Sequence, residues 1–201
     1  VIAQIAAEEP SLLANVSPER IRDELNKLLT GVAPGKGLRG LVWSGLLPII
    51  APEFTPVVKT PGLMEHLIAT VEAIKPEPHL RWAAFLHDLG KPATRIEDDR
   101  GVHYFGHEQA GERLAGALLE RLRFSRAFQE QVLTLVRRHM FPCDPGMTDT
   151  ALRRLAAKVG RDALFDLLEL RRADIVASGN HCHRAWRILS EFASRIRALL
   201  R

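Results

Sequence analysis

Several histidine and aspartate side chains occur in this sequence where their surroundings would make them chemically useful. Residues 80–86 are apolar on nearly every side, which predicts a buried helix, and this run leads directly into His87-Asp88. Burying an ionised carboxylate is costly unless it is paired, hydrogen-bonded or bound to a metal ion. Asp174 has a similar setting on an apolar helix, and His66 borders an apolar stripe. Two such carboxylates with two histidines suit a divalent metal, whereas each residue taken alone favours a core ion pair or an ordinary core histidine.

Helices must position these side chains, because apolar residues recur with helical periodicity along nearly the whole chain. Ser17-Pro18 is a typical helix start, with the serine as the cap and the proline in the first turn. We expect helices over residues 2–14, 18–30, 37–47, 63–74, 79–89, 107–122, 126–139, 148–158, 162–177 and 181–200. Residues 48–61 contain four prolines and are predicted to form an irregular connector.

One hairpin is the expected exception to the helical pattern. Residues 94–97 and 102–105 flank the segment 98–101, whose final glycine suits a left-handed turn position. The chain has no internal repeat and no low-complexity tract. The predicted fold class is therefore all-α, a compact helical bundle with a small β-hairpin.

Composition excludes several classes of protein. A length of 201 residues fits one domain with at most a short appendage, and the two cysteines exclude a disulfide framework. We find no bilayer-spanning segment and no signal sequence, so we expect a cytoplasmic protein without a membrane partner. The net charge is +4, and the basic excess lies in residues 101–201. Its arginine pairs, Arg137-Arg138 and Arg171-Arg172 among them, suit phosphate contacts with RNA, and the alternative is solvated helix faces.

The spaced pattern of His66, His87-Asp88 and Asp174 resembles that of the HD superfamily of metal-dependent phosphohydrolases. The string from His87 to Pro92, which includes Lys91, is close to the form common in that family. Two further histidines match positions found in its two-metal members, His107 and His139.

The resemblance implies a metal site and a reaction. Asp88 would bridge two metal ions, with His66, His87 and Asp174 completing the first site and His107 and His139 the second. The implied cofactor is one or two divalent ions of Mn, Ni, Fe, Co or Zn, with Mg possible, since the ligand types do not select one metal. The implied reaction is in-line attack of metal-bound water on a phosphoester, with catalytic residues Asp88, His87 and Lys91. Lys91 would contact the substrate phosphate, and the alternative is that it is a cation at a helix C-terminus.

A narrower resemblance covers nearly the whole chain. Residues 18–25, 104–108, 152–155 and 172–174 are similar to the neck helix and HD domain in the C-terminal half of bacterial tRNA nucleotidyltransferases and poly(A) polymerases. The chain has nothing resembling the Gly-rich phosphate loop of that family's catalytic head, so we expect no nucleotidyl transfer from this chain alone. A head on the same or a separate chain is the implied partner.

Three segments follow from this reading: a helical, RNA-binding-like neck over 1–33, a helix and Pro-rich connector over 34–60, and an HD phosphohydrolase domain over 61–201. The expected activity is that of a phosphatase or 2′,3′-cyclic phosphodiesterase acting on RNA (tRNA) or small nucleotide phosphoesters. One alternative is a non-catalytic, tRNA-binding helical body of a tRNA-processing enzyme. Another is a nucleotide hydrolase of a different HD branch.

The remaining histidines are given no role in the site. His103 is expected on the predicted strand and outside the site, and His79 at the surface where a helix starts. The His-Cys-His run at 181–183 is not taken as a metal site, because adjacent helical residues point apart.

Overall fold

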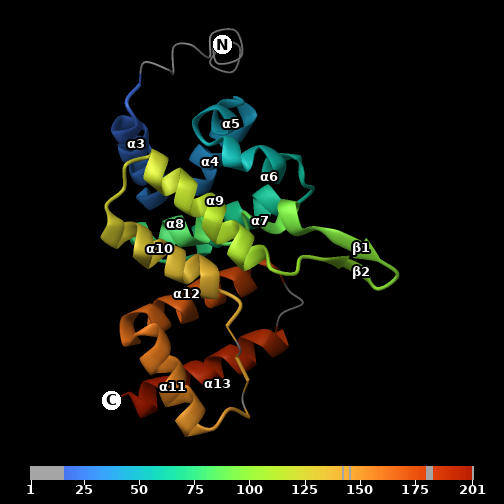
Figure 1. Cartoon of the computed structure of the whole chain (residues 1–201), viewed down its shortest axis with the longest axis vertical. Coiled ribbons are helices and arrows are strands. Elements are labelled where there is room, and N and C mark those ends of the chain that lie inside the picture. The colour runs from blue at the N-terminus through green and yellow to red at the C-terminus, as the bar shows by residue number, and fades with distance from the viewer. Residues whose placement is uncertain (1–15, 142, 145, 180–182, 201) are drawn as a thin grey trace.

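The computed structural model describes residues 16–141, 143–144, 146–179 and 183–200. The described residues form helices apart from one antiparallel hairpin, which confirms the predicted fold class (Figure 1). The N-terminal elements are α3 (Pro18–Thr30), α4 (Pro34–Trp43), α5 (Leu46–Ile50), η1 (Pro52–Phe54) and α6 (Thr55–Lys59). The central elements are α7 (Leu63–Ala73), α8 (Pro78–Leu86), η2 (Lys91–Thr94), β1 (Ile96–Asp98), β2 (Gly101–His103), α9 (His107–Arg121) and α10 (Arg126–Arg138). The last three helices are α11 (Asp149–Val159), α12 (Arg161–Ala177) and α13 (His183–Leu199).

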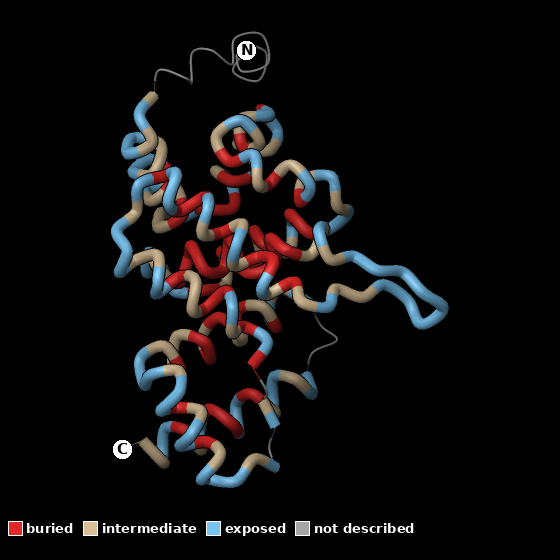
Figure 2. Tube along the Cα trace, in the orientation of Figure 1, coloured by how far each residue is buried: buried red, intermediate tan, exposed pale blue. Residues whose placement is uncertain are grey.

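Helix α8 lies at the centre of the bundle and packs against α7, α10, α12 and α3. Every residue from Leu80 to Gly90 is buried, as the apolar sequence predicts, and the buried positions of the molecule concentrate around this helix (Figure 2). Trp82 and Phe85 are among its largest fully buried side chains. Any polar group at the C-terminal end of α8 is therefore held by surrounding helices.

Helix α3 is joined to this core by polar contacts as well as by packing. The Ser17 hydroxyl accepts a hydrogen bond from Arg20 N, which confirms the predicted cap. The Trp82 indole N–H donates to Asn26 Oδ1 at 2.6 Å, and Arg81 Nη1 donates to the Leu29 carbonyl oxygen at 3.2 Å. These contacts satisfy buried donors of α8 and attach α3 to the helix that leads into His87-Asp88.

The prediction that residues 48–61 form an irregular connector is wrong. This segment contains the end of α5 and the short helices η1 and α6. Pro52 and Pro56 stand in the first turns of η1 and α6, where a fixed φ and a missing N–H are tolerated. Phe54 of η1 and Val57 of α6 are fully buried, so tertiary packing stabilises helices that are too short to be stable alone.

Other element boundaries also differ from the prediction. The helix expected over 37–47 is α4, which begins at Pro34 and ends at Trp43, because Gly45 adopts a left-handed φ of 71° before α5. The predicted hairpin exists, but its strands are shorter, and the pair Asp98 and Gly101 closes a two-residue turn. The helix predicted over 2–14 and part of the run at 181–183 lie outside the described residues.

The described part of the chain contains no helix that is both long and apolar enough to cross a bilayer.

Candidate metal centre

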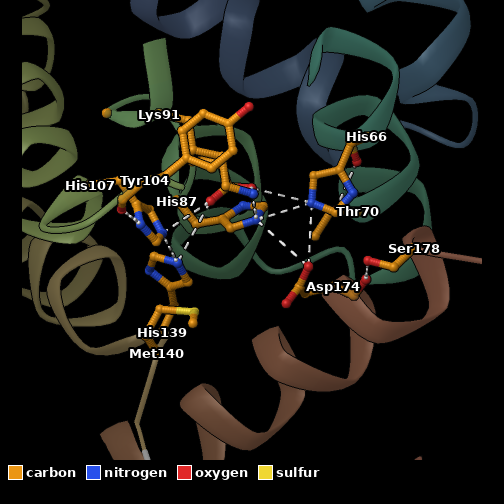
Figure 3. Close-up of polar contacts among 12 residues, drawn as sticks. His66, Thr70, His87, Lys91, Tyr104, His107, His139, Met140, Asp174 and Ser178 are labelled. Atoms are coloured by element: carbon orange, nitrogen blue, oxygen red, sulfur yellow. Dashed lines mark hydrogen bonds and ion pairs between the residues drawn. The ribbon is translucent and has the colours of Figure 1, made fainter. Parts of the chain in front are cut away.

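The six residues predicted as metal ligands meet in one place around the C-terminal end of α8 (Figure 3). They come from five separate parts of the fold. His66 lies on α7, His87-Asp88 follows α8, His107 begins α9, His139 follows α10, and Asp174 lies on α12.

The first cluster forms around the Nε2 atom of His66. This nitrogen lies 3.4 Å from His87 Nε2, 3.4 Å from Asp88 Oδ2 and 3.3 Å from Asp174 Oδ1. His87 Nε2 is also 3.2 Å from Asp88 Oδ2 and 4.0 Å from Asp174 Oδ1. The group compact enough to hold one ion therefore consists of His66, His87 and Asp88, and Asp174 lies beside it, next to His66.

The second cluster uses the other oxygen of the same aspartate. His107 Nε2 lies 3.0 Å from His139 Nε2. Asp88 Oδ1 is 3.4 Å from His107 Nε2 and 3.7 Å from His139 Nε2. The carboxylate of Asp88 thus stands between two groups of histidines and presents one oxygen to each.

Backbone carbonyl groups orient three of the four imidazoles. The Nδ1 atoms of His87, His107 and His139 lie 2.9, 2.8 and 2.7 Å from the carbonyl oxygens of Ala84, Tyr104 and Val136. Each of these carbonyls belongs to the residue three positions earlier in the chain. A carbonyl oxygen can only accept, so Nδ1 carries the proton and donates it, and the Nε2 lone pair points into the cluster.

This donor set fits a divalent transition metal. Imidazole nitrogens that face each other with lone pairs, beside a carboxylate, repel one another unless a proton or a cation lies between them. Metal–nitrogen and metal–oxygen bonds of about 2.0–2.2 Å place the ligand atoms of one ion roughly 3.0–3.5 Å apart. Most of the distances within the two clusters, which run from 3.0 Å to 4.0 Å, lie in or near that range.

The electrostatics of the centre favour a bound cation. Burial raises the pKa of Asp88, but His87, His66 and Lys91 outweigh it and hold the pKa well below the usual range. Burial also raises the pKa of Asp174, but the hydrogen bond to His66 and the electrostatic interaction with His87 outweigh it and lower the pKa to about 2. Both carboxylates are therefore ionised at neutral pH.

The histidines respond to the same surroundings in opposite directions. Burial and the neighbouring His87 lower the pKa of His139 to about 3, so its imidazole is neutral. Burial lowers the pKa of His66 as well, but hydrogen bonds to Asp174 and Asp88 outweigh it and raise the pKa to about 9. A cation bound between these groups would replace the proton of His66 as the countercharge for both carboxylates.

Two cavities open beside the centre. A cavity of about 470 Å³ borders Asp88, His107 and His139, and one of about 250 Å³ borders His66 and residues 60–63. The side chains that line both are Lys91, Tyr104, Asp174 and Ser178. A ligand could therefore approach the two clusters from either side of these shared residues.

Lys91 lines both cavities. Its Nζ atom lies 2.6 Å from Asp88 Oδ2 and 5.6 Å from the centre of the Tyr104 ring. The short 3-10 helix η2 places it there, one turn after the His-Asp pair. The ammonium group is thus directed toward the clusters.

The four arginines predicted to bind phosphate or RNA have different surroundings. Arg171 lines the larger cavity, and its Nη1 lies 2.8 Å from Asp174 Oδ2. Arg172 is paired with Glu169 and donates to the Ala73 carbonyl, and Arg137 is paired with Glu112. Arg138, in the last turn of α10, is half-buried. Of these four, the structure brings Arg171 to the centre.

Sequence reasoning missed part of the cavity lining. His103 was expected outside the site, and it lines the larger cavity, although it belongs to neither metal cluster. Phe105 and Met140 also line this cavity. No pattern in the sequence marks these positions, because they depend on the turn at Gly106 that leads into α9 and on the end of α10.

The sequence profile described as "HD domain" matches residues 64–179, which contain all six residues of the centre. The chain belongs to the HD domain family. This confirms the predicted resemblance. A second profile, described as "Probable RNA and SrmB- binding site of polymerase A", matches residues 1–57, immediately before the HD domain.

Curated relatives of this HD domain chain include two named as tRNA nucleotidyltransferases and one named as a CCA protein. The chain is 35% identical over 188 residues to a CC-adding tRNA nucleotidyltransferase of Thermus thermophilus, covering 87% of this chain and 43% of the relative. It is 35% identical over 190 residues to an A-adding tRNA nucleotidyltransferase of Deinococcus radiodurans, covering 86% and 43%. A Multifunctional CCA protein of Legionella pneumophila is 31% identical over 140 residues, covering 64% and 34%. The chain thus spans less than half the length of these relatives.

Proposed function

We propose that this chain is the divalent-metal-dependent phosphohydrolase domain of a tRNA nucleotidyltransferase-like protein. The reaction is hydrolysis of a phosphoester by water, of the phosphatase or 2′,3′-cyclic phosphodiesterase type. The observation that carries the proposal is the position of Asp88, whose two carboxylate oxygens face different groups of histidine Nε2 atoms. A carboxylate shared in this way suits a pair of cations, and paired cations are typical of in-line displacement at phosphorus.

The ligands divide into two sets. His66, His87, Asp88 and Asp174 would hold one ion, and Asp88, His107 and His139 the other. Nitrogen and oxygen donors suit Mn, Ni, Fe, Co or Zn, and Mg is a further candidate. When bound, such ions neutralise the negative charge that develops on the phosphoryl oxygens and lower the pKa of a water molecule toward neutrality.

The chain's own side chains supply the remaining functions. The catalytic residues are Asp88, His87 and Lys91. His87 is oriented by the Ala84 carbonyl, which holds its Nε2 atom toward Asp88. Lys91 lies at the junction of the two cavities, where its ammonium group can bind a non-bridging oxygen of the substrate phosphate. Arg171 holds Asp174 in place and adds positive charge to the larger cavity.

Hydrolysis of p-nitrophenyl phosphate and bis(p-nitrophenyl) phosphate by the metal-loaded chain tests the proposal. Asp88→Asn and His87→Gln are expected to lower kcat/KM by at least about 100-fold, because each removes a side chain that would bind the metal ion and fix its position. The matched control is His79→Gln. His79 Nε2 lies 3.0 Å from Asp166 Oδ2, a similar histidine–aspartate pair that belongs to neither metal cluster. Turnover by the Asp88→Asn and His87→Gln variants at the wild-type rate would refute the proposal.

A second candidate is a non-catalytic, tRNA-binding helical body. The similarity of residues 1–57 to an RNA-binding profile and the names of the relatives favour it. Filter binding of tRNA at several salt concentrations tests it, because contacts to RNA phosphates weaken steeply with salt. Salt-dependent binding together with no hydrolysis by the metal-loaded chain would favour this candidate, and salt-independent or absent binding would count against it.

A further part of the proposal concerns the longer protein to which this chain would belong. The chain matches less than half of its relatives' length, and we assign nucleotidyl transfer to a head domain outside the matched part. A cytoplasmic location is part of the same proposal, as is tRNA as a partner. Turnover of nucleoside triphosphates or cyclic dinucleotides in preference to simple phosphoesters would instead favour a nucleotide hydrolase of another HD branch.

A further inference from the structure

Phe105 is a large aromatic residue at the surface. It is 73% exposed and lies between β2 and the start of α9. Gly106, with a φ of 74°, turns the chain from the hairpin into α9 immediately after it. The His103 ring stacks against Phe105, with centroids 5.3 Å apart and planes inclined by 8°. His103 is in turn held by Asp98 Oδ1 at 3.0 Å, so the stacked pair is supported from the hairpin.

This pair lies in the larger cavity beside the metal centre. Phe105 and His103 line the same space of about 470 Å³ as Asp88, His107 and His139. Phe105 precedes the ligand His107 by two residues, so the ring and the second cluster are connected by a short, turned segment. Tyr104, between the stacked rings in sequence, lies over the centre near Lys91 (Figure 3). The cavity therefore combines an aromatic face with positions suited to a phosphate.

We propose that Phe105 determines substrate specificity by stacking against the nucleobase of a nucleotide whose phosphoester lies over Asp88 and Lys91. The inference rests on the proposed function. A planar ring stacks favourably on an exposed aromatic face, whichever base it carries. Apart from Val102 and Met140, the other groups that line this cavity are polar or charged, His103 and Arg171 among them, which suits a ring with polar edges rather than an aliphatic chain. A cavity of this volume is in the range that holds small-molecule ligands.

The first test compares two substrates that differ only in the base, adenosine 5′-monophosphate and ribose 5-phosphate. We expect the wild-type chain to prefer the nucleotide, and Phe105→Ala to lower the ratio of the two kcat/KM values by about 5- to 100-fold, mainly through KM. Phe105→Trp should keep the ratio, because it keeps a stacking face. The control is Trp43→Ala, which removes a 79% exposed aromatic side chain from the last residue of α4.

The second test is independent of turnover. Adenosine 5′-monophosphate should quench the fluorescence of the Phe105→Trp variant beyond any change in the wild-type chain, and ribose 5-phosphate should not. Quenching without hydrolysis of either substrate would support the stacking and refute the phosphohydrolase proposal.

Hydrolysis of both substrates with an unchanged ratio in Phe105→Ala, together with no quenching, would overturn the inference and leave the proposed function standing. An equal loss of activity toward both substrates in Phe105→Ala would also overturn it, because the ring would then act on the shape of the centre and not on the base.

Discussion

Replacing Gly90 by alanine tests whether the packing behind Asp88 sets the position of the second cluster. A Cβ atom at Gly90 would lie 2.1 Å from the His107 carbonyl oxygen and 2.4 Å from Gly111 N. Both neighbours are backbone atoms, so no side chain can rotate away to relieve the contact. Gly90 has a φ of −80° and a ψ of −13°, which alanine adopts without strain, so any effect of the substitution comes from this contact.

The size of the effect follows from these distances. Relief requires the start of α9 to move by about 1 Å, because real Cβ atoms essentially never approach closer than 3.0 Å. His107 Nε2 would move with it relative to Asp88 Oδ1, from which it now lies 3.4 Å away. Metal sites tolerate ligand displacements of about 0.2 Å, so the second ion should be lost. Overpacking of this kind costs about 1–3 kcal/mol, which lowers Tm by roughly 2–12 °C in a chain of this length.

Elemental analysis after dialysis against Mn²⁺ measures the result, together with thermal unfolding followed by circular dichroism. We expect two ions per wild-type chain and one per Gly90→Ala chain. The control is Gly116→Ala on α9, the helix that Gly90→Ala would displace. The new Cβ at this position would lie an ordinary 3.7 Å from Leu133 Cδ1. That variant should bind two ions with an unchanged or higher Tm, since alanine favours a helix interior by about 1 kcal/mol over glycine. Two ions and a wild-type Tm in Gly90→Ala would refute the reasoning.

Three other perturbations have definite expected outcomes. A chelator should lower the Tm of the wild-type chain by roughly 5–10 °C relative to protein with Mn²⁺ at about 100 times its Kd, and equal Tm values would argue against a bound ion. Lys91→Gln should lower kcat/KM for a phosphoester by about 10- to 100-fold, because a charge-assisted contact to phosphate is lost, whereas the exposed Lys59→Gln should not. A hydrogen bond to Asp166 outweighs burial and raises the pKa of His79, so their pair stabilises the fold fully below about pH 6.5 and less as pH rises through the raised value. His79→Gln should therefore cost about 1 kcal/mol in urea unfolding at pH 6 and less at pH 9, and a cost that grows with pH would contradict this assignment.

The sequence predicts the helical core well, because α8 and its partners carry strong periodic patterns. Four residues of the centre, His66, His87, Asp88 and Asp174, are predicted by similar reasoning, since histidines and aspartates beside apolar runs need a partner. His107 and His139 are predicted only by the resemblance to the two-metal members of the HD superfamily. Whether these residues bind metal stays a prediction, as does the division of the chain at residues 33 and 60.

The features that the sequence does not predict correctly depend on tertiary contacts, which local sequence patterns do not contain. The prolines of residues 48–61 signal a break in a long helix, but they equally suit the first turns of short helices that bury Phe54 and Val57. The arginine pairs indicate positive charge, yet Arg172 and Arg137 are bound to glutamates that lie 3 and 25 positions away. The role of Phe105 in the cavity lining is set by the turn at Gly106, which a sequence pattern cannot place over the centre.

The separation of the ligands along the chain has a consequence during synthesis. His66 is translated early and Asp174 more than a hundred codons later. Asp88 lies between the histidines of both clusters only when α7, α10 and α12 have packed against α8 and α9 has packed against α10 and η2. A nascent chain cannot assemble either the complete first cluster or its cavity before α12 has left the ribosome. The proposed cleavage of phosphoesters would therefore begin only in finished molecules.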